Sequence, residues 1–193
     1  NVRLLFIGGE FERKGGQFLL RWLRETRRRD FSLDIVTRSS VADMPGVTVH
    51  RHFMPDQPGL VELVQRADLL VHPTRADTSS WAIAEAKAAG TAVLSTRVCG
   101  IPELVREDVD GHIVPPNDYG RFAQRLESMI DNREALRGFG MRAREDALDR
   151  LDADKNARRL IAFVRARLGG TALDLPPQDA PLAGVSRCEV TPG

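Results

Sequence analysis

The sequence predicts an α/β protein with a doubly wound parallel sheet. Short apolar runs of strand length recur between residues 3 and 114, and stretches with apolar residues at helical spacing separate them. This alternation is typical of repeated strand–helix units, whose strands pair in parallel. After residue 114 the pattern changes, because only helical stretches follow.

The strands of this pattern are expected at residues 3–7, 33–37, 47–50, 69–72, 92–95 and 112–114. Of the helices between them, one has Leu19 and Trp22 on its apolar face, and another has Leu60 and Val64. These apolar faces are expected to cover the sheet.

A further helix is expected to follow a cap at Thr78 or Ser79 and to run to Ala89. Gly90 can end this helix, because glycine readily adopts the left-handed conformation found at helix ends. The helix and the strands beside it form the segment on which the functional prediction depends.

The last part of the sequence is expected to be helical and then disordered. Helices are expected at residues 119–130, 134–148 and 154–168, and Asp118 can cap the first of them. From Gly169 onward the composition turns to proline, glycine, alanine and aspartate without periodicity. Residues 1–169 are therefore expected to form the folded domain, and residues 170–193 a disordered tail.

The composition limits the class of protein. The chain has 193 residues, of which 42% are apolar and 28% charged, as is ordinary for a soluble domain. A net charge of +1 favours no polyanionic partner such as nucleic acid. Cys99 and Cys188 fit neither a metal site nor a disulfide framework, so a cytoplasmic location is expected. Asn1 leads at once into a core strand, which suggests a piece of a longer protein.

The most informative feature is a pair of carboxylates, Asp77 and Glu85, eight residues apart. Asp77 is expected on the loop after a strand, and Glu85 inside the helix that follows. Ligands of open parallel sheets collect at the carboxyl ends of the strands, so both acids can face one crevice. Ionised carboxylates only accept hydrogen bonds, which suits a ligand rich in hydroxyl groups, such as a sugar or a ribose.

The loop after the first strand is suited to a diphosphate. Gly8 and Gly9 allow backbone amides to approach an anion closely, and Arg13 and Lys14 precede the next helix, whose N-terminus favours negative charge. The glycine spacing does not match the dinucleotide fingerprint, and no serine or threonine follows Lys14 as in a P-loop.

Together these segments resemble the family 4 retaining glycosyltransferases. Residues 73–105 resemble the family's donor-binding signature, with Asp77, then Glu85 in the run EAKAAG, then the loop GIPE at 100–103. Residues 6–16, FIGGEFERKGG, resemble its glycine-rich diphosphate loop, and residues 110–118, DGHIVPPND, resemble its turn after a later strand. The three matches occur in the family's order between residues 4 and 130.

The resemblance implies a Rossmann-like domain that is the C-terminal half of a GT-B fold. This half holds the nucleotide-sugar donor, and a missing N-terminal domain holds the acceptor, which can be a saccharide, a lipid or a protein. The isolated chain is therefore expected to bind the donor without transferring its sugar.

The resemblance also implies roles for individual residues. Arg13 and Lys14 would stabilise the leaving diphosphate, so that neither a metal nor a cofactor is needed. Asp77 would contact the donor sugar, and Glu85 the ribose. The remaining substrate-binding candidates are Gly8, Gly9, Phe53, Ser79, Ser80 and Trp81, of which Phe53 would stack on the base.

Three departures from the family pattern affect these assignments. Many members have glutamate where this chain has Asp77, phenylalanine–glycine where it has Ser79–Ser80, and arginine where it has Gly9. Aspartate reaches about one methylene less, and serine cannot match glycine's close approach. A shifted donor preference or a weaker activity is the expected consequence.

Other interpretations stay open. An epimerase or a phosphorylase can use the same fold, and a non-catalytic relative can serve as a nucleotide-binding or scaffolding module. His72 is interpreted as a packing residue rather than a catalyst. The arginines between residues 21 and 29 are interpreted as a solvated helix face, with peripheral contact at the inner face of the membrane as the alternative.

Overall fold

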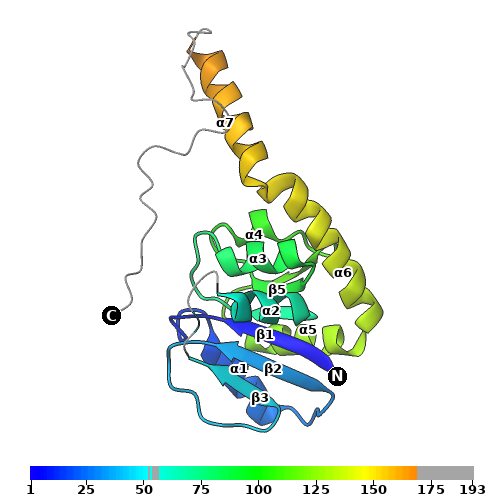
Figure 1. Cartoon of the computed structure of the whole chain (residues 1–193). Helices are drawn as coiled ribbons and strands as arrows, with labels where there is room; N and C mark the ends of the chain where they lie inside the picture. Colours follow the sequence, from blue (N-terminus) through cyan, green and yellow to red (C-terminus); the bar gives the residue numbers. More distant parts are fainter. Residues whose placement is uncertain (52, 54–56, 169–193) are drawn as a thin grey trace, which may run out of the picture. The chain divides into compact units, whose positions relative to one another are not determined.

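The computed structural model describes residues 1–51, 53 and 57–168, and its ribbon is shown in Figure 1. Its centre is a parallel sheet of β1 (Val2–Ile7), β2 (Phe31–Val36), β3 (Val47–His50), β4 (Leu69–His72), β5 (Ala92–Thr96) and β6 (Gly111–Val114). The strand order is β3-β2-β1-β4-β5-β6, and all paired strands are parallel. The chain first builds the sheet outward from β1 and then returns to β4, so the winding reverses between β1 and β4. The predicted doubly wound sheet is thereby confirmed.

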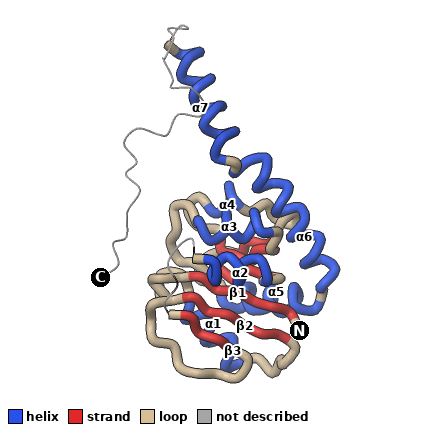
Figure 2. Tube along the Cα trace, viewed as in Figure 1, coloured by secondary structure: helices blue, strands red, loops and turns tan. Residues whose placement is uncertain are grey.

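Helices cover both faces of this sheet, as the tube in Figure 2 shows. They are α1 (Gly16–Glu25), α2 (Pro58–Arg66), α3 (Trp81–Ala89), α4 (Ile101–Leu104), α5 (Tyr119–Asp131) and α6 (Arg133–Asp146). A π-helical turn (Ala147–Leu151) and α7 (Ala153–Arg167) come after α6 in the chain. The predicted strands, and the helices predicted at residues 119–130, 134–148 and 154–168, agree with these bounds to within two residues, and a π-helical turn follows α6.

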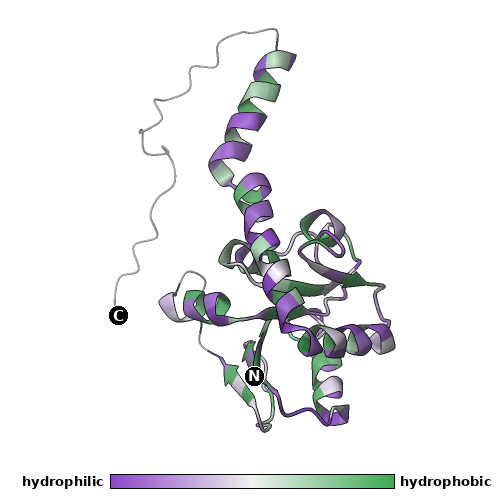
Figure 3. Cartoon of the chain, turned by 90° about the vertical axis from the view of Figure 1, so that its right-hand side faces the viewer, coloured by the Kyte–Doolittle hydropathy of each residue, from purple (hydrophilic) through white to green (hydrophobic). Residues whose placement is uncertain are grey.

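The alternation of side chains along β1 explains the two layers of helices. Leu4 and Phe6 point into a core shared with α1 and α5, and Leu5 points into a second core shared with α2, α3 and α4. All three side chains are buried, and Figure 3 shows the hydrophobic colour running along the strands. A sheet buried on both faces explains why its strands read as continuous apolar runs.

The start of α3 corrects the predicted cap. Ser80, rather than Thr78 or Ser79, occupies the N-cap position, and no side-chain hydrogen bond caps the helix. The Ser80 hydroxyl instead contacts the ring of His72. The other two predicted helix ends are confirmed, because Asp118 accepts a hydrogen bond from the Arg121 amide, and Gly90 ends α3 with φ of 85°.

The arginines of residues 21–29 do not form one solvated helix face, because α1 ends at Glu25. Arg28 lies beyond it and pairs with Asp30, Glu127 and Asp131. This interpretation of the sequence was wrong because it extended the helix by four residues.

The chain divides into two units, residues 1–152 and a second unit that begins at Ala153. In the described part of the second unit, α7 has no buried residue. The predicted tail at residues 170–193 lies outside the described residues. Across the described ranges, the structure contains no helix with the length and apolar character that crossing a bilayer requires.

Candidate functional site

Two loops meet where the winding of the sheet reverses, one following β1 and one following β4. The Arg75 amide donates to the Arg13 carbonyl over 2.9 Å, and the Arg13 guanidinium donates to the Ala76 carbonyl over 2.7 Å. These bonds hold the two loops together at the carboxyl edge of the sheet, which is the position expected for a ligand site.

Gly15 allows the loops to approach this closely. It has φ of 80°, and a Cβ at this position would collide with the backbone carbonyl of Pro73. Glycine alone satisfies both conditions without strain. The same residue precedes α1 and has no side chain to cap it. The amides of Gly16 and Phe18 donate to the carbonyls of Phe11 and Gly15, so among the first three amides of α1 only that of Gln17 remains for an anion.

Lys14 and Asp77 are brought together by this contact. The Lys14 ammonium group pairs with Oδ2 of Asp77, and the side chains are 16% and 7% exposed. The ring nitrogen Nε2 of His72 lies 3.2 Å from the same oxygen. The three side chains come from the loop after β1, the end of β4 and the loop after β4, so they form a site through the tertiary fold.

The electrostatics of this group are those of an ionised acid beside a neutral ring. The hydrogen bond from His72, aided by Lys14, holds the pKa of the Asp77 carboxyl well below its usual range against the opposing effect of burial. Burial lowers the pKa of His72, because the charged ring would lose its hydration, and this outweighs the attraction of Asp77.

His72 was interpreted from the sequence as a packing residue, but in the structure its ring also makes polar contacts. It is fully buried, but its ring is bonded to Asp77 and to Ser80, each at 3.2 Å. The sequence did contain a signal for this role, because His72 is the only polar residue of the otherwise apolar run 69–72 and stands at its carboxyl end.

Arg13 lies near Lys14, Asp77 and His72, but it makes no hydrogen bond to Asp77 within the described residues. Its guanidinium bonds Glu10 over 2.8 and 2.9 Å as well as the Ala76 carbonyl, and its pKa is raised mainly by Glu10. The predicted basic pair is thus divided, since Lys14 contacts Asp77 and Arg13 fastens the loop that carries it.

Glu85 has different surroundings from Asp77. It is exposed on the second turn of α3 and lines a groove of about 300 Å³ between α2 and α3, together with Leu60, Val61 and Val64. Asp77 was expected to face the same crevice, but it does not line this groove. One ligand can contact both acids only if it reaches from the loop after β4 along the start of α3.

The other predicted binding residues fall into three places. Gly8 is buried against Lys14 and Phe6, whereas Gly9 is exposed with open space beside it. The Trp81 side chain is 80% exposed at the start of α3. Ser79 is exposed, and Ser80 is buried beside His72. The ring centroid of Phe53 lies 5.3 Å from that of His50.

A second groove, of about 430 Å³, lies at the N-terminus of α1. Gly15, Gln17 and Phe18 line it together with Arg75 and Asn117. Arg75 was not assigned a role from the sequence. Its position on the loop that also carries Asp77 adds a third cation to this edge of the sheet.

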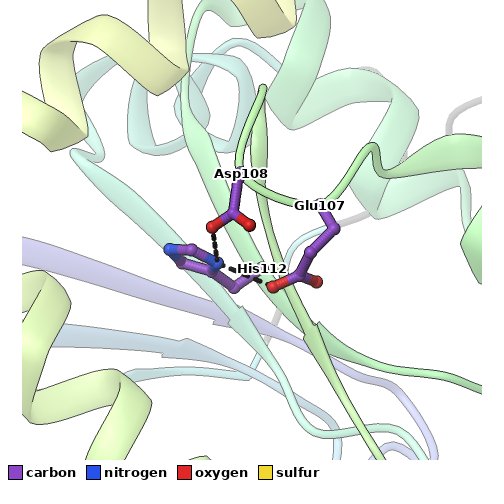
Figure 4. Close-up of side chains that lie close together, drawn as sticks. All are labelled: Glu107, Asp108 and His112. Atoms are coloured by element: carbon purple, nitrogen blue, oxygen red, sulfur yellow. Dashed lines mark hydrogen bonds and ion pairs between the residues drawn. The ribbon is translucent and has the colours of Figure 1, made fainter.

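Glu107, Asp108 and His112 form a separate cluster, which is drawn in Figure 4. One side-chain oxygen from each acid and one ring nitrogen of His112 lie within 4.8 Å of one another. The Nδ1 atom of His112 lies 2.9 Å from Glu107 and 3.3 Å from Asp108, and Glu107 also accepts from the Ile113 amide over 2.7 Å. The cluster surrounds the first residues of β6, the edge strand that lies two strands away from β4. Hydrogen bonds within this turn account for its geometry.

The fold defines a class, the Rossmann-like domains of proteins with GT-B architecture. HepE of Anabaena, solved in complex with UDP-glucose, has the same fold with a TM-score of 0.71 and 16% identity, over 86% of this chain and 49% of that one. The C-terminal domain of the group 1 glycosyl transferase LpcC from Francisella tularensis matches 79% of this chain and 87% of its own, with a TM-score of 0.65 and 15% identity.

Residues 1–132 match the family model of the glycosyl transferases group 1, and the chain belongs to this family. It is 28% identical over 189 residues to D-inositol 3-phosphate glycosyltransferase 1 of Catenulispora acidiphila, over 86% of this chain. The chain spans 44% of the length of that relative. The resemblance inferred from the three motifs is confirmed.

Proposed function

We propose that this chain is the donor-binding domain of a retaining, metal-independent glycosyltransferase, which transfers a sugar from a nucleotide-diphosphate sugar to an acceptor. The observation that carries the proposal is the contact of Lys14 with Asp77 at the point where the winding of the sheet reverses. A cation for a phosphate and an acid for a hydroxyl lie there side by side, in a chain of the matching family.

The diphosphate belongs at the groove beside the N-terminus of α1. Gln17 in the first turn of α1 lines this groove, and so does Arg75. Lys14 lies on the adjoining loop, where it can exchange part of its contact with Asp77 for a phosphate oxygen. Fixed cations at this position stabilise the negative charge that develops as the bond from sugar to phosphate breaks.

Asp77 and Glu85 bind the two ends of the same ligand in this proposal. The carboxylate of Asp77 accepts from a hydroxyl of the donor sugar, and Glu85, one turn into α3, accepts from the ribose. The base lies beyond Glu85, toward Phe53 at the start of α2. The relative HepE was solved with UDP-glucose, which supports a nucleotide sugar as the donor and makes uridine the first base to test.

Transfer requires a second domain in this proposal, because the chain spans less than half of its relative and offers only one wall of a cleft. That domain would supply the acceptor site and exclude water. We place the reaction in the cytoplasm, which the cysteine content of the sequence favours.

A thermal-shift and calorimetric panel tests the proposal on the chain itself. UDP, GDP, ADP and their glucose conjugates are each added in the presence of EDTA. A ligand at a hundred times its dissociation constant stabilises the folded state by about 2.7 kcal/mol, which raises the melting temperature by several degrees.

The variants are Lys14→Met and, as a matched control, Arg66→Ala on the outer face of α2. We expect one nucleotide to bind the wild type and the control, and to bind Lys14→Met at least about tenfold more weakly. Binding that needs a divalent metal would contradict the metal-independent mechanism. No binding by any nucleotide would favour the scaffolding alternative.

A further inference from the structure

We propose that His72 is a positioning residue for Asp77: its neutral ring donates one hydrogen bond that turns the free carboxylate oxygen of Asp77 toward the donor sugar. This inference rests on the proposed function, because it concerns the same site. It assigns a role to a residue that the sequence marked only for packing.

The two oxygens of Asp77 are used differently. Lys14 and His72 both contact Oδ2, whereas Oδ1 makes no hydrogen bond with the residues that the structure describes. Two donors on one oxygen fix the rotation of the carboxylate about its Cβ–Cγ bond. Oδ1 is thereby left as the acceptor for a hydroxyl group.

The contact with Asp77 also decides where His72 carries its proton. An ionised carboxylate only accepts hydrogen bonds, so Nε2 must be the protonated nitrogen. The opposite nitrogen, Nδ1, is buried and has no partner among the described residues. A proton on Nδ1 would be a buried donor without an acceptor, and a cationic ring would carry that same cost together with a buried charge.

The charged groups that face the ring agree with a neutral His72. Asp77 attracts a second proton, but Lys14 and Arg13 repel it, and burial of the ring opposes it most strongly. The neighbouring cations are those that the diphosphate would contact. Binding of an anion beside them would weaken this repulsion, whereas the burial of the ring would remain.

Ser80 completes the arrangement. Ser80 is buried at the N-cap position of α3, and its hydroxyl lies 3.2 Å from Nε2 of His72. Because Nε2 is the donor, the Ser80 oxygen accepts a second branch of this hydrogen bond from the same ring nitrogen. Asp77 and Ser80 both depart from the family pattern, which has glutamate and glycine at these positions. The two departures are therefore coupled, because the His72 ring that bonds the shorter Asp77 side chain is also bonded by Ser80.

The first test measures the ring nitrogens of His72 by NMR in the free chain. We expect the neutral Nε2–H tautomer throughout about pH 6 to 8. An Nδ1–H tautomer, or an imidazolium in this range, would overturn the inference. No nucleotide is needed, so this result is independent of whether the proposed function is correct.

The second test compares affinities for UDP and UDP-glucose, or for the diphosphate and glucose conjugate of whichever base binds in the panel. The ratio of the two dissociation constants gives the gain in affinity that the sugar contributes. In His72→Phe we expect this gain to fall by up to about tenfold, with the affinity for the diphosphate alone little changed. His72→Gln carries an amide N–H at a similar reach and is expected to restore the gain.

The matched control is His112→Phe, which removes a buried histidine–carboxylate pair on β6, two strands away from β4. Circular dichroism and melting temperature establish that each variant is folded. An unchanged gain in folded His72→Phe would overturn the inference. So would an equal loss in His72→Phe and His72→Gln, because the ring shape rather than the hydrogen bond would then matter.

Discussion

At the scale of single residues, the three cations near the reversal point are in different states. Lys14 is paired with Asp77, and Arg13 is paired with Glu10 and bonded to a carbonyl. The Arg75 guanidinium makes no hydrogen bond or ion pair with the described residues, and it lines the groove at the N-terminus of α1. An anion in that groove would thus meet Arg75 without first breaking another contact.

Arg75→Ala is therefore expected to weaken binding of a nucleoside diphosphate by about tenfold or more, the range for a hydrogen bond to a charged group. Arg75→Lys should recover part of the loss, because it keeps the charge but not the forked geometry. Calorimetric titration measures both, with Arg66→Ala as the control. An affinity that Arg75→Ala leaves unchanged would place the diphosphate away from this groove.

At the scale of elements, α3 is anchored by a buried lysine. The side chain of Lys87 is fully buried, and its ammonium group pairs with Asp110, with Asp146 at the end of α6 and with the Leu104 carbonyl. These contacts hold α3 against three other parts of the unit, and so they set the orientation of Glu85 two residues earlier. Removing one partner of a buried charge group leaves the others without compensation.

Lys87→Met is expected to lower the free energy of unfolding by about 3–5 kcal/mol, because two buried carboxylates lose their buried partner and keep contacts only with partly exposed arginines such as Arg106. Urea denaturation followed by circular dichroism measures the change. Adding Asp146→Asn to this variant should recover part of the loss, since one unpaired charge is removed. A loss below about 1 kcal/mol would indicate that Arg106, which also contacts both acids, holds the group without Lys87.

The elements were predictable from the sequence to the extent that local patterns determine them. The apolar runs at β1 and β4 and the glycine after α3 act through neighbouring residues, so their positions were predicted correctly. The cap of α3 was predicted wrongly, because the Ser80 hydroxyl bonds a ring eight residues away in the chain rather than its own helix. Lys87 was not recognised because both of its acid partners are distant in sequence.

The site residues also divide into those that the sequence could predict and those that depend on contacts between distant parts of the chain. Lys14 and Asp77 were both assigned to the donor site through the family resemblance, and both follow strands, whose carboxyl ends open at one edge of a parallel sheet. Their direct contact was not predicted. The bond from His72 to Asp77 could not be predicted, since it depends on which way two side chains turn inside the fold. The separate surroundings of Glu85 could not be predicted either, because they depend on where α2 packs beside α3.

At the scale of the whole molecule, the site is expected to make the fold sensitive to acid. His72 has a lowered pKa in the folded chain, so between that pKa and its ordinary value of about 6.5 the unfolded chain binds a proton that the folded chain does not. Its contribution to stability is present above about pH 6.5 and is lost as the pH falls. Asp77 also has a lowered pKa, so its contribution is lost only as the pH falls below about 4.

The free energy of unfolding should therefore decrease in two stages as the pH falls from about 7.5 to 3.5, each with a slope of at most about 1.4 kcal/mol per pH unit. Urea denaturation at a series of pH values measures it. His72→Phe should flatten the stage that begins near pH 6.5, and Asp77→Asn the stage that begins near pH 4. An equal slope above pH 5 in the wild type and His72→Phe would mean that the buried ring does take up a proton in the folded chain. In that case, the hydrogen bond to Asp77 would be made by an imidazolium, and the acid would be held by charge rather than by a neutral donor.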